Sequence, residues 1–348
     1  MAPIRNTKLI FNAPVSGLPE PGKSALYDTT NTIDPEAVPL NGSVLIKLLY
    51  ISIDPLMRGQ MRDSSLPSSF PFPAYSIGQP TYGYGVGKII RSEKDGLENG
   101  DYVVSQTMEH AEYSIPTNPE LLEKITPEPG LPPSVYVGIA GMPGRTAYFA
   151  WREFSKAKKG ETAFVSTAAG PVGSLVLQLA KLEGLKVIAS VGSDEKVEVV
   201  KSLGADVAFN YKTADMQDIL AKEGPIDIYW DNVSGSTLDA ALANAALHAR
   251  FICCGMLSVL GTKMGEGIPM KNLMNIVVRR VTMNGFIMTD LTEKWEKEFN
   301  EVIPKKLASG EIKYIEDKTR GLENVVEGLV ELMSGKNVGK KIVVVSDD

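Results

Sequence analysis

The sequence predicts an α/β protein with two domains, one built on a doubly wound parallel sheet and one that is smaller and β-rich. From about Val135 onward, short apolar runs alternate with amphipathic segments of about ten residues, which is typical of βαβ units and a parallel sheet. The preceding residues are rich in proline and hold short β-like runs separated by glycine and proline turns, which indicates an irregular, barrel-like domain. A chain of 348 residues has room for about two domains.

The residue pattern of each segment predicts its type. In the β-rich part, the predicted strands are Val44–Ile53, Tyr84–Ile90 and Asp101–Val104. In the second part, the predicted strands are Ala163–Thr167, Lys186–Val191, Val207–Asn210, Ile226–Trp230, Arg250–Cys254 and Val281–Ile287. Apolar residues at helical spacing predict helices over Val172–Glu183, Asp194–Leu203, Ala214–Lys222, Ser236–His248 and Trp295–Ala308. The tail from Gly321 predicts one more helix and a final strand, Lys341–Val345, which returns to the first domain.

The composition argues against several classes of protein. A net charge of −6 does not suit nucleic acid or an anionic membrane as a partner, because both bind basic surfaces. Two histidines, His110 and His248, and two adjacent cysteines, Cys253 and Cys254, are too few for the usual catalytic and structural zinc sites, so we expect no metal. The first residues lack the apolar core of a signal peptide, and no apolar stretch is long enough to span a bilayer. Because free thiols are typical of a reducing compartment, we expect a cytoplasmic protein.

The turn between the first strand of the βαβ array and its helix carries a phosphate-binding motif. Residues 167–173 read Thr-Ala-Ala-Gly-Pro-Val-Gly, the Rossmann dinucleotide fingerprint with Ala168 in the first glycine position. Gly170 lets the backbone approach a pyrophosphate, Gly173 lets the helix pack on the strand, and Pro171 suits the first helical turn. The helix N-terminus then offers free N–H groups to the phosphates. The alternative is a tight turn without a ligand, but the βαβ units that follow favour the nucleotide.

The end of the second strand favours NADP(H) over NAD(H). An NAD-binding chain normally places an acidic residue there to hold the ribose hydroxyls, whereas this strand ends in Val191-Gly192-Ser193. Asp194 follows as a helix-start residue, and Lys196 lies on the first helical turn, within reach of a 2′-phosphate. Tyr211, after the next strand, is placed to cover the same phosphate. Taken singly, an exposed helix lysine and a surface turn tyrosine are the alternatives.

Several motifs, in one order along nearly the whole chain, resemble a known family. The stretches that carry the resemblance are Ser52–Gly59, Gly141–Phe149, Ala168–Gly173, Gly192–Lys196, Phe209–Lys212, Asp231–Val233, Gly285–Ile287 and Asn337–Lys340. They are similar to the zinc-independent branch of the medium-chain dehydrogenase/reductases, the group of prostaglandin reductases and plant-type alkenal double-bond reductases. The resemblance implies NADPH-dependent reduction of a carbon–carbon double bond conjugated to an aldehyde or ketone. It also implies a homodimer that acts on a small-molecule enal or enone.

The same resemblance implies how the domains share the work. Residues 136–309 are expected to form the Rossmann dinucleotide-binding domain. Residues 1–135 and 310–348 are expected to form a GroES-like barrel domain that holds substrate and catalytic groups. The residues implied to bind the cofactor are Ala169, Gly170, Pro171, Val172, Gly173, Lys196, Tyr211, Asn232, Cys254, Gly255, Leu257, Ser258, Phe286, Ile287, Met288 and Asn337.

The sequence departs from the family at two places that bear on chemistry. Leu56 replaces a tyrosine of the Asp-Pro-Tyr-Met-Arg motif, and Leu260 stands where the family commonly carries a tyrosine that hydrogen-bonds the substrate oxygen. The enolate that forms during conjugate reduction needs a hydrogen-bond donor, which leucine cannot supply. The candidates are Tyr84, Tyr50, a cofactor ribose hydroxyl or water. We expect Leu260 to make the pocket more apolar there.

Two other functions fit the same sequence. A zinc-independent quinone oxidoreductase needs the same fold and cofactor. An NADPH-binding protein with little catalysis fits the missing tyrosine, although the intact cofactor motifs oppose it.

Overall fold

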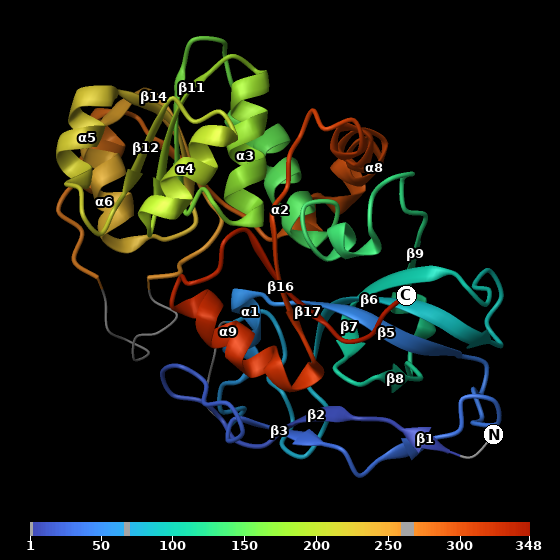
Figure 1. Ribbon diagram of the computed structural model, residues 1–348. Helices are drawn as coiled ribbons and strands as arrows, with labels where there is room; N and C mark the ends of the chain where they lie inside the picture. The colour runs from blue at the N-terminus through green and yellow to red at the C-terminus, as the bar shows by residue number, and fades with distance from the viewer. Residues whose placement is uncertain (1–2, 66–69, 259–267) are drawn as a thin grey trace. The chain divides into compact units, whose positions relative to one another are not determined.

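The computed structural model describes residues 3–65, 70–258 and 268–348. The chain forms two compact units: unit 1 is Met1–Gly138 with Glu316–Asp348, and unit 2 is Ile139–Ile315. Each unit has its own sheet (Figure 1). The α/β fold class predicted from the sequence is confirmed, whereas the assignment of substrate and nucleotide to the two domains stays a prediction.

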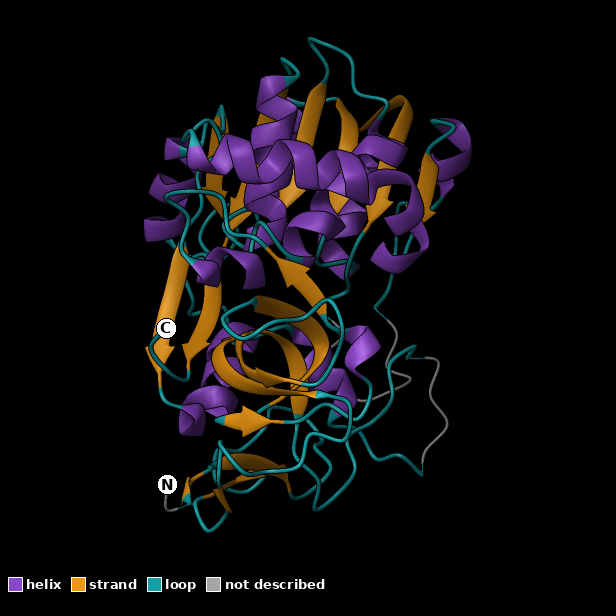
Figure 2. Ribbon diagram, turned by 90° about the vertical axis from the view of Figure 1, so that its right-hand side faces the viewer, coloured by secondary structure: helices purple, strands orange, loops and turns teal. Residues whose placement is uncertain are grey.

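Unit 2 is a parallel sheet in which strand order follows the Rossmann pattern. Its order is β12 (Val207–Asn210), β11 (Lys186–Val191), β10 (Thr162–Ser166), β13 (Ile226–Asp231), β14 (Ala245–Cys253) and β15 (Thr282–Gly285). Every neighbouring pair is parallel, and helices lie against the sheet (Figure 2). The order reverses between β10 and β13, and ligands of such sheets bind beside this switch point.

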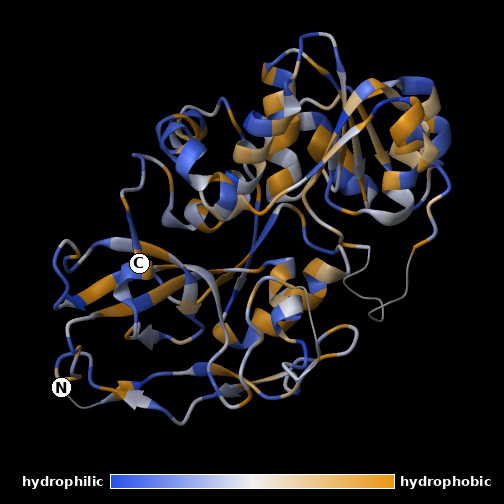
Figure 3. Cartoon of the chain, turned by 180° about the vertical axis from the view of Figure 1, so that it is seen from behind, coloured by the Kyte–Doolittle hydropathy of each residue, from blue (hydrophilic) through white to orange (hydrophobic). Residues whose placement is uncertain are grey.

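The helices of unit 2 lie between, before and after these strands in the chain. They are α2 (Met142–Ala150), α3 (Pro171–Leu182), α4 (Asp194–Ser202), α5 (Met216–Glu223), α6 (Gly235–Ala243), α7 (Met274–Val278) and α8 (Thr292–Ala308). A π-helical turn, Trp151–Ser155, continues α2, and a 3₁₀ turn, Met288–Leu291, precedes α8. The helices carry both hydrophilic and hydrophobic residues, as elements with one buried face do (Figure 3). Stacked Phe164 and Tyr229, with ring centroids 5.0 Å apart, belong to the core under the sheet.

One predicted helix of unit 2 is wrong in its second half. The helix expected over Ser236–His248 ends at Ala243, and β14 begins at Ala245. The residues Ala245-Ala246-Leu247 fit either type of element, because a short apolar run does not distinguish helix from strand. Tertiary pairing decides, since Ala245 pairs with Ile226 and the amide of His248 donates to Arg279 O at 2.7 Å.

Unit 1 contains an antiparallel sheet completed by the chain's C-terminal segment. Its order is β16 (Glu316–Arg320), β17 (Lys340–Val344), β5 (Val44–Ser52), β6 (Tyr82–Ser92), β7 (Tyr102–Glu109) and β9 (Glu123–Ile125), with β8 (Tyr113–Ser114) on β5. Only β16 and β17 run parallel to each other. Smaller pairs are β1 (Ile4–Arg5) with β4 (Thr32–Ile33), and β2 (Lys8–Phe11) with β3 (Ala25–Asp28). The helices are α1 (Pro55–Gln60) and α9 (Val325–Met333), with 3₁₀ turns at Pro119–Leu121, Pro133–Val137 and Leu322–Asn324.

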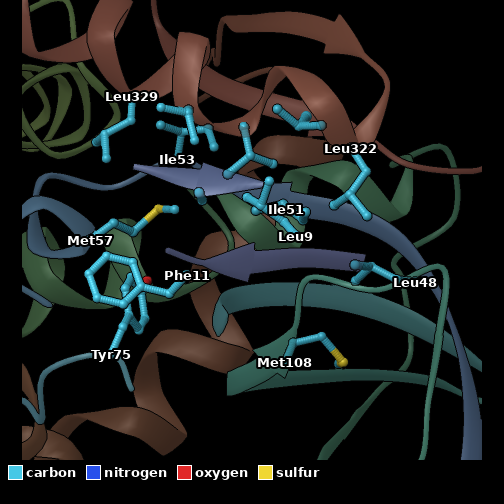
Figure 4. Packing of buried hydrophobic residues seen from close by; sticks show 14 of the residues in the cluster. Leu9, Phe11, Leu48, Ile51, Ile53, Met57, Tyr75, Met108, Leu322 and Leu329 are labelled. Atoms are coloured by element: carbon cyan, nitrogen blue, oxygen red, sulfur yellow. The ribbon is translucent and has the colours of Figure 1, made fainter. Parts of the chain in front are cut away.

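The core of unit 1 joins residues from both ends of the chain. Figure 4 shows Leu322 and Leu329, from the C-terminal segment, packed beside Ile51 and Ile53 of the first 60 residues. A buried ion pair reinforces the junction, because Lys340 Nζ lies 2.7 Å from Asp54 Oδ1 and donates to Ile53 O at 2.8 Å. Burial lowers the pKa of Lys340, and Asp54 opposes that shift.

In the described part of the chain, no helix combines the length and apolar character that crossing a membrane requires.

His110 gives unit 1 a pH-dependent stability. Its ring is buried, with Nδ1 2.8 Å from Thr81 Oγ1, and Nε2 has no hydrogen-bond partner among the described residues. Burial lowers the pKa of His110 from 6.5 to about 3. Below pH 6.5, His110 therefore binds a proton in the unfolded chain but not in the folded chain. Its contribution to the unfolding free energy is complete above pH 6.5 and is lost as the pH falls toward 3.

We predict that His110→Gln flattens the fall of stability with pH. Between pH 6.5 and 5.5, the wild type should lose about 1 kcal/mol of unfolding free energy more than the variant, because the unfolded histidine becomes protonated over this range. Urea unfolding at several pH values between 6.5 and 5.5, followed by circular dichroism, measures the difference. His248→Gln, which makes the same change at an exposed histidine, is the matched control. Equal slopes for wild type and His110→Gln would contradict the assignment.

Candidate cofactor and active site

The switch point of the unit 2 sheet is held by a hydrogen-bonded joint between Ser166 and Asn232. Asn232 Nδ2 donates to Ser166 O at 2.7 Å, and the Asn232 amide donates to Ser166 Oγ at 2.9 Å. Ser166 Oγ donates in turn to Trp230 O at 3.1 Å. These bonds join the carboxyl ends of β10 and β13, so the loops that follow both strands start from one fixed place.

The loop after β10 has the geometry of a phosphate cradle. Thr167 adopts a left-handed φ of 53°, which turns the chain sharply out of the strand. Gly170 caps α3 and Pro171 begins it, and the first helical bond runs from the Ser174 amide to Gly170 O at 2.8 Å. The amides of Val172 and Gly173 precede that bond, so they belong to the free donors of the helix end. These are the groups that a pyrophosphate requires.

The two glycines of this loop have different surroundings. A Cβ on Gly173 would lie 2.6 Å from Thr167 O and 2.8 Å from Ala168 Cα, both backbone atoms. A Cβ on Gly170 would meet nothing nearer than Thr167 O at 3.6 Å. Gly173 is thus required by packing within the chain, whereas the chain itself leaves the space at Gly170 open. A glycine with such open space is what the close approach of a pyrophosphate to the backbone requires.

The end of β11 forms the second part of the candidate site. A Cβ on Gly192 would lie 3.2 Å from Tyr211 Oη, so the tyrosine hydroxyl sits directly beside the strand end. Ser193 caps α4 by accepting the Lys196 amide at 3.4 Å. Lys196 is 8% exposed, which differs from the alternative of an exposed helix lysine, while Tyr211 is 48% exposed at the start of a turn.

Asp231 stands at the end of β13 as a buried carboxylate with several donors. It accepts hydrogen bonds from Tyr229 Oη at 2.8 Å, the Val233 amide at 2.9 Å and the Ser234 amide at 2.7 Å. Burial raises the pKa of Asp231, and these hydrogen bonds act in the opposite direction. Its bonds run within unit 2, so its role there is to shape the turn that leads into α6.

Hydrogen bonds join the segment after β14 to the segment after β13. The Cys254 and Gly255 amides donate to Asp231 O at 2.9 and 3.0 Å, and the Leu257 amide donates to Asn232 O at 3.2 Å. Ser258 Oγ donates to Val233 O at 2.6 Å. The predicted cofactor residues Cys254, Gly255, Leu257 and Ser258 therefore run alongside Asn232.

The segment after β15 is supported by aromatic contacts. The Phe286 ring lies 6.1 Å from that of Trp230 and 6.1 Å from that of Phe154, which belongs to the π-helical turn. Trp230 is fully buried, and its Nε1 donates to Asn232 Oδ1 at 3.1 Å. One tryptophan thus supports both Asn232 and Phe286. Ile287 is exposed, and Met288 begins the 3₁₀ turn before α8.

The remaining predicted residues lie in unit 1 or outside the described part. Tyr84 is 6% exposed, and it lies where the β6–β7 pairing shifts register between Gly83 and Gly85. Such irregularities often stand next to active sites. Tyr50 pairs with Val86, and burial raises its pKa. Asn337 is buried, and its Nδ2 donates to Gly339 O at 2.8 Å. Leu260 lies outside the described residues.

Comparison with known proteins gives this arrangement a family. Residues 12–125 match a family described as the N-terminal domain of oxidoreductase, and residues 171–305 match one described as zinc-binding dehydrogenase. A 2-alkenal reductase (NADP(+)-dependent) of Nicotiana tabacum is 40% identical, over 99% of this chain and 98% of that protein. A (+)-pulegone reductase of Mentha piperita is 36% identical, over 99% of each chain.

A solved structure agrees with these relatives. CurA of Vibrio vulnificus, determined in complex with NADPH, superimposes with a TM-score of 0.86 at 30% identity, over 98% of this chain and 100% of that one. The chain belongs to the zinc-independent alkenal and enone reductase family of medium-chain dehydrogenase/reductases. Its cofactor is NADP(H), the dinucleotide of these relatives.

The cysteines of this family member are poor metal ligands. Burial raises the pKa of Cys253 to about 11 and that of Cys254 to about 12, so both stay protonated thiols at neutral pH. A thiolate is the form that binds zinc. Over residues 3–65, 70–258 and 268–348, no group of three or more His, Cys, Asp or Glu side chains is placed to hold a metal ion.

Sequence reasoning missed the residues that hold the site together. The sequence pattern places Ser166 and Trp230 in strands and makes Asn210 the last residue of a strand, but it gives none of them a further role. Their roles depend on hydrogen bonds such as that from Asn210 Nδ2 to Asp194 Oδ1 at 2.8 Å, which joins residues 16 positions apart. Asn210 lies within the family motif Phe209–Lys212, and this motif is the sequence signal that marks it.

We predict opposite responses from the two loop glycines. Gly173→Ala should lower the unfolding free energy by about 1–3 kcal/mol, because its Cβ overlaps backbone that must shift. Gly170→Ala should leave stability within about 1 kcal/mol of the wild type but weaken NADPH binding about tenfold, because its Cβ enters the space left for the pyrophosphate. Thermal unfolding and NADPH fluorescence titration measure the two effects. A stable Gly173→Ala variant, or a Gly170→Ala variant that binds NADPH normally, would contradict this account.

Proposed function

We propose that this protein reduces the carbon–carbon double bond of α,β-unsaturated aldehydes and ketones, adding hydride to the β-carbon and a proton to the α-carbon. The proposal rests on the similarity to 2-alkenal and pulegone reductases over nearly the full length of each chain, because these relatives share both units with this chain. When bound, NADPH supplies the hydride. The protein's part is to position the two reactants and to stabilise the charge that develops on the carbonyl oxygen.

The cofactor residues divide into two groups by their place on the unit 2 sheet. Val172 and Gly173 hold the pyrophosphate through backbone amides, and Ala169, Gly170 and Pro171 form the turn beside it. Lys196 and Tyr211 hold the 2′-phosphate with a cation and a hydroxyl. The nicotinamide end is bordered by Asn232, Cys254, Gly255, Leu257, Ser258, Phe286, Ile287 and Met288. Asn337, from the tail, contacts the cofactor. The nucleotide domain, expected from the sequence at residues 136–309, corresponds to unit 2, Ile139–Ile315. The substrate domain, expected at residues 1–135 with 310–348, corresponds to unit 1, Met1–Gly138 with Glu316–Asp348.

Tyr84 is the proposed hydrogen-bond donor to the substrate oxygen. Tyr84 lies at the register shift between Gly83 and Gly85, and such irregularities of a strand pair are common next to active sites. Tyr50 is the weaker candidate, because Lys318, Glu316 and Asp348 contribute to its electrostatic surroundings near the chain's C-terminus. A water or a ribose hydroxyl remains the alternative donor.

We predict that Tyr84→Phe lowers kcat for an enone about tenfold or more while the Kd of NADPH stays unchanged. The change removes one hydroxyl and keeps the ring. Steady-state rates from the loss of NADPH absorbance, together with a fluorescence titration of NADPH, separate the two effects. Tyr50→Phe is the matched control and should keep kcat. An unchanged kcat in Tyr84→Phe would assign the donor to the ribose hydroxyl or water.

A quinone is the rival substrate class, and the same assay decides between them. An alkenal or enone should be turned over with a kcat/KM well above that for a simple quinone, and mass spectrometry should find the saturated carbonyl product. A preference for quinones would favour the oxidoreductase alternative. NADPH binding without turnover of either class would favour a binding protein. We expect the active protein to be cytoplasmic, as its free thiols suggest.

The edge of the unit 2 sheet supports a homodimer. Among the described strands, β15 is the last in the sheet and pairs only with β14. The preceding helix, α7, exposes apolar side chains, with Met274 69% and Val277 70% exposed. A second copy placed against this edge would continue the sheet and cover these side chains, which a monomer leaves in water.

We predict that the wild type is a dimer at micromolar concentration and that Val277→Asp makes it a monomer, because an interface charge costs several kcal/mol when buried unpaired. Sedimentation velocity measures the mass. Leu182→Asp is the matched control, since Leu182 is an exposed apolar residue on another helix, α3, and should leave the dimer intact. A monomeric wild type would refute the proposed interface.

A further inference from the structure

Asn210, the last residue of β12, connects the ends of two strands. It is 9% exposed and pairs with Val191 of β11, directly before Gly192. Its side-chain Nδ2 donates to Asp194 Oδ1 at 2.8 Å, and its Oδ1 accepts the Lys212 amide at 3.1 Å. Both ends of the amide are therefore used, which fixes its orientation.

Asp194 is the carboxylate closest in sequence to the end of β11. NAD-binding Rossmann domains use an acidic group at this strand end to accept hydrogen bonds from the adenosine ribose hydroxyls. Here Gly192 directly follows the strand end, and Asp194 comes two residues later as the first residue of α4, exposed to solvent. A carboxylate so near this end would repel a 2′-phosphate if its side chain turned toward it.

The bond from Asn210 directs that carboxylate to the end of β12. The same residue also holds the turn that carries Tyr211, because its carbonyl oxygen accepts the Thr213 and Ala214 amides at 3.1 and 3.0 Å. The Tyr211 hydroxyl in turn lies beside Gly192. Asn210 therefore holds a phosphate-binding side chain near the strand end and an acidic side chain in a fixed direction.

We propose that Asn210 determines the preference for NADPH over NADH by holding the Asp194 carboxylate away from the adenosine 2′-position. This inference rests on the proposed function and deepens it. Asn210 is a positioning residue, since its hydrogen bonds join it to the Asp194 side chain and to the backbone amides of residues 212–214. Without its amide, Asp194 is free to turn toward the ribose, where it accepts hydrogen bonds from NADH and repels NADPH.

The test is a cycle of three variants: Asn210→Ala, Asp194→Asn and the double variant. For each, fluorescence titration gives the Kd of NADPH and of NADH, and thermal unfolding checks the fold. Asn210→Ala should lower the ratio of Kd(NADH) to Kd(NADPH) about fivefold or more. In the Asp194→Asn background the same change should leave the ratio unaltered, because no carboxylate is released. Asn244→Ala is the control, because the Asn244 side chain donates to Ala240 O of the helix directly before it, α6.

The cycle separates this role from a purely structural one. If Asn210 acted only by holding the Tyr211 turn, its loss would change the ratio equally in both backgrounds, and the proposal would be wrong. An unchanged ratio in Asn210→Ala would also overturn it. If the wild type bound neither dinucleotide, the proposed function would fail instead, so the two failures are distinguishable.

A second pair of variants covers the case in which Asn210→Ala does not fold. Asn210→Asp keeps the acceptor for the Lys212 amide but sets two carboxylates against each other, so it should lower the ratio. Adding Asp194→Asn restores one amide and one carboxylate in exchanged positions, and the preference for NADPH should return toward the wild-type value. A double variant with the low ratio of Asn210→Asp would contradict the proposal.

Discussion

The hydrogen-bonded joint between Ser166 and Asn232 is the constraint on which the candidate site depends. A parallel sheet whose order reverses must leave a crevice between the two strands at the reversal, and here these are β10 and β13. Asn232 bonds to both the carbonyl and the hydroxyl of Ser166, so the two strand ends stay together while their loops separate. The phosphate loop leaves from one side of the joint, and the segment that leads to residues 254–258 is fastened to the other.

Around this joint, the chain satisfies its buried polar groups with its own atoms. Asn232, Asp231 and Asn210 each make several short hydrogen bonds to protein partners. Such bonds cost little when the partners are already in place, and an unpaired buried amide or carboxylate is expensive. The site is therefore rigid before a ligand arrives, as precise positioning of a dinucleotide requires. The open space at Gly170 and the free amides of α3 are the features that we propose receive the pyrophosphate.

The fold class could be predicted from the sequence because strand and helix periods are local patterns, whereas the phosphate-binding role of residues 167–173 stays a prediction. The strands Lys186–Val191 and Val207–Asn210 appear with the bounds that their apolar runs predict. The helix expected through His248 was wrong, since pairing with β13 converts its last residues into strand. Asn210 and Trp230 could not be assigned a role from local patterns, because one partner of each, Asp194 and Phe286 respectively, lies 16 or more positions away along the chain. The hydrogen-bond donor to the substrate oxygen stays a prediction, since Leu260 stands where the family commonly carries the tyrosine that fills this role.

The chemistry can be tested by following one atom. The protein should be incubated with an α,β-unsaturated ketone and NADPH that carries deuterium at its transferable position, and the product examined by NMR. The account predicts one deuterium on the former β-carbon, a proton from solvent on the α-carbon and an intact carbonyl group. Deuterium on the carbonyl carbon, with the double bond retained, would show an alcohol dehydrogenase type of reaction and contradict the account.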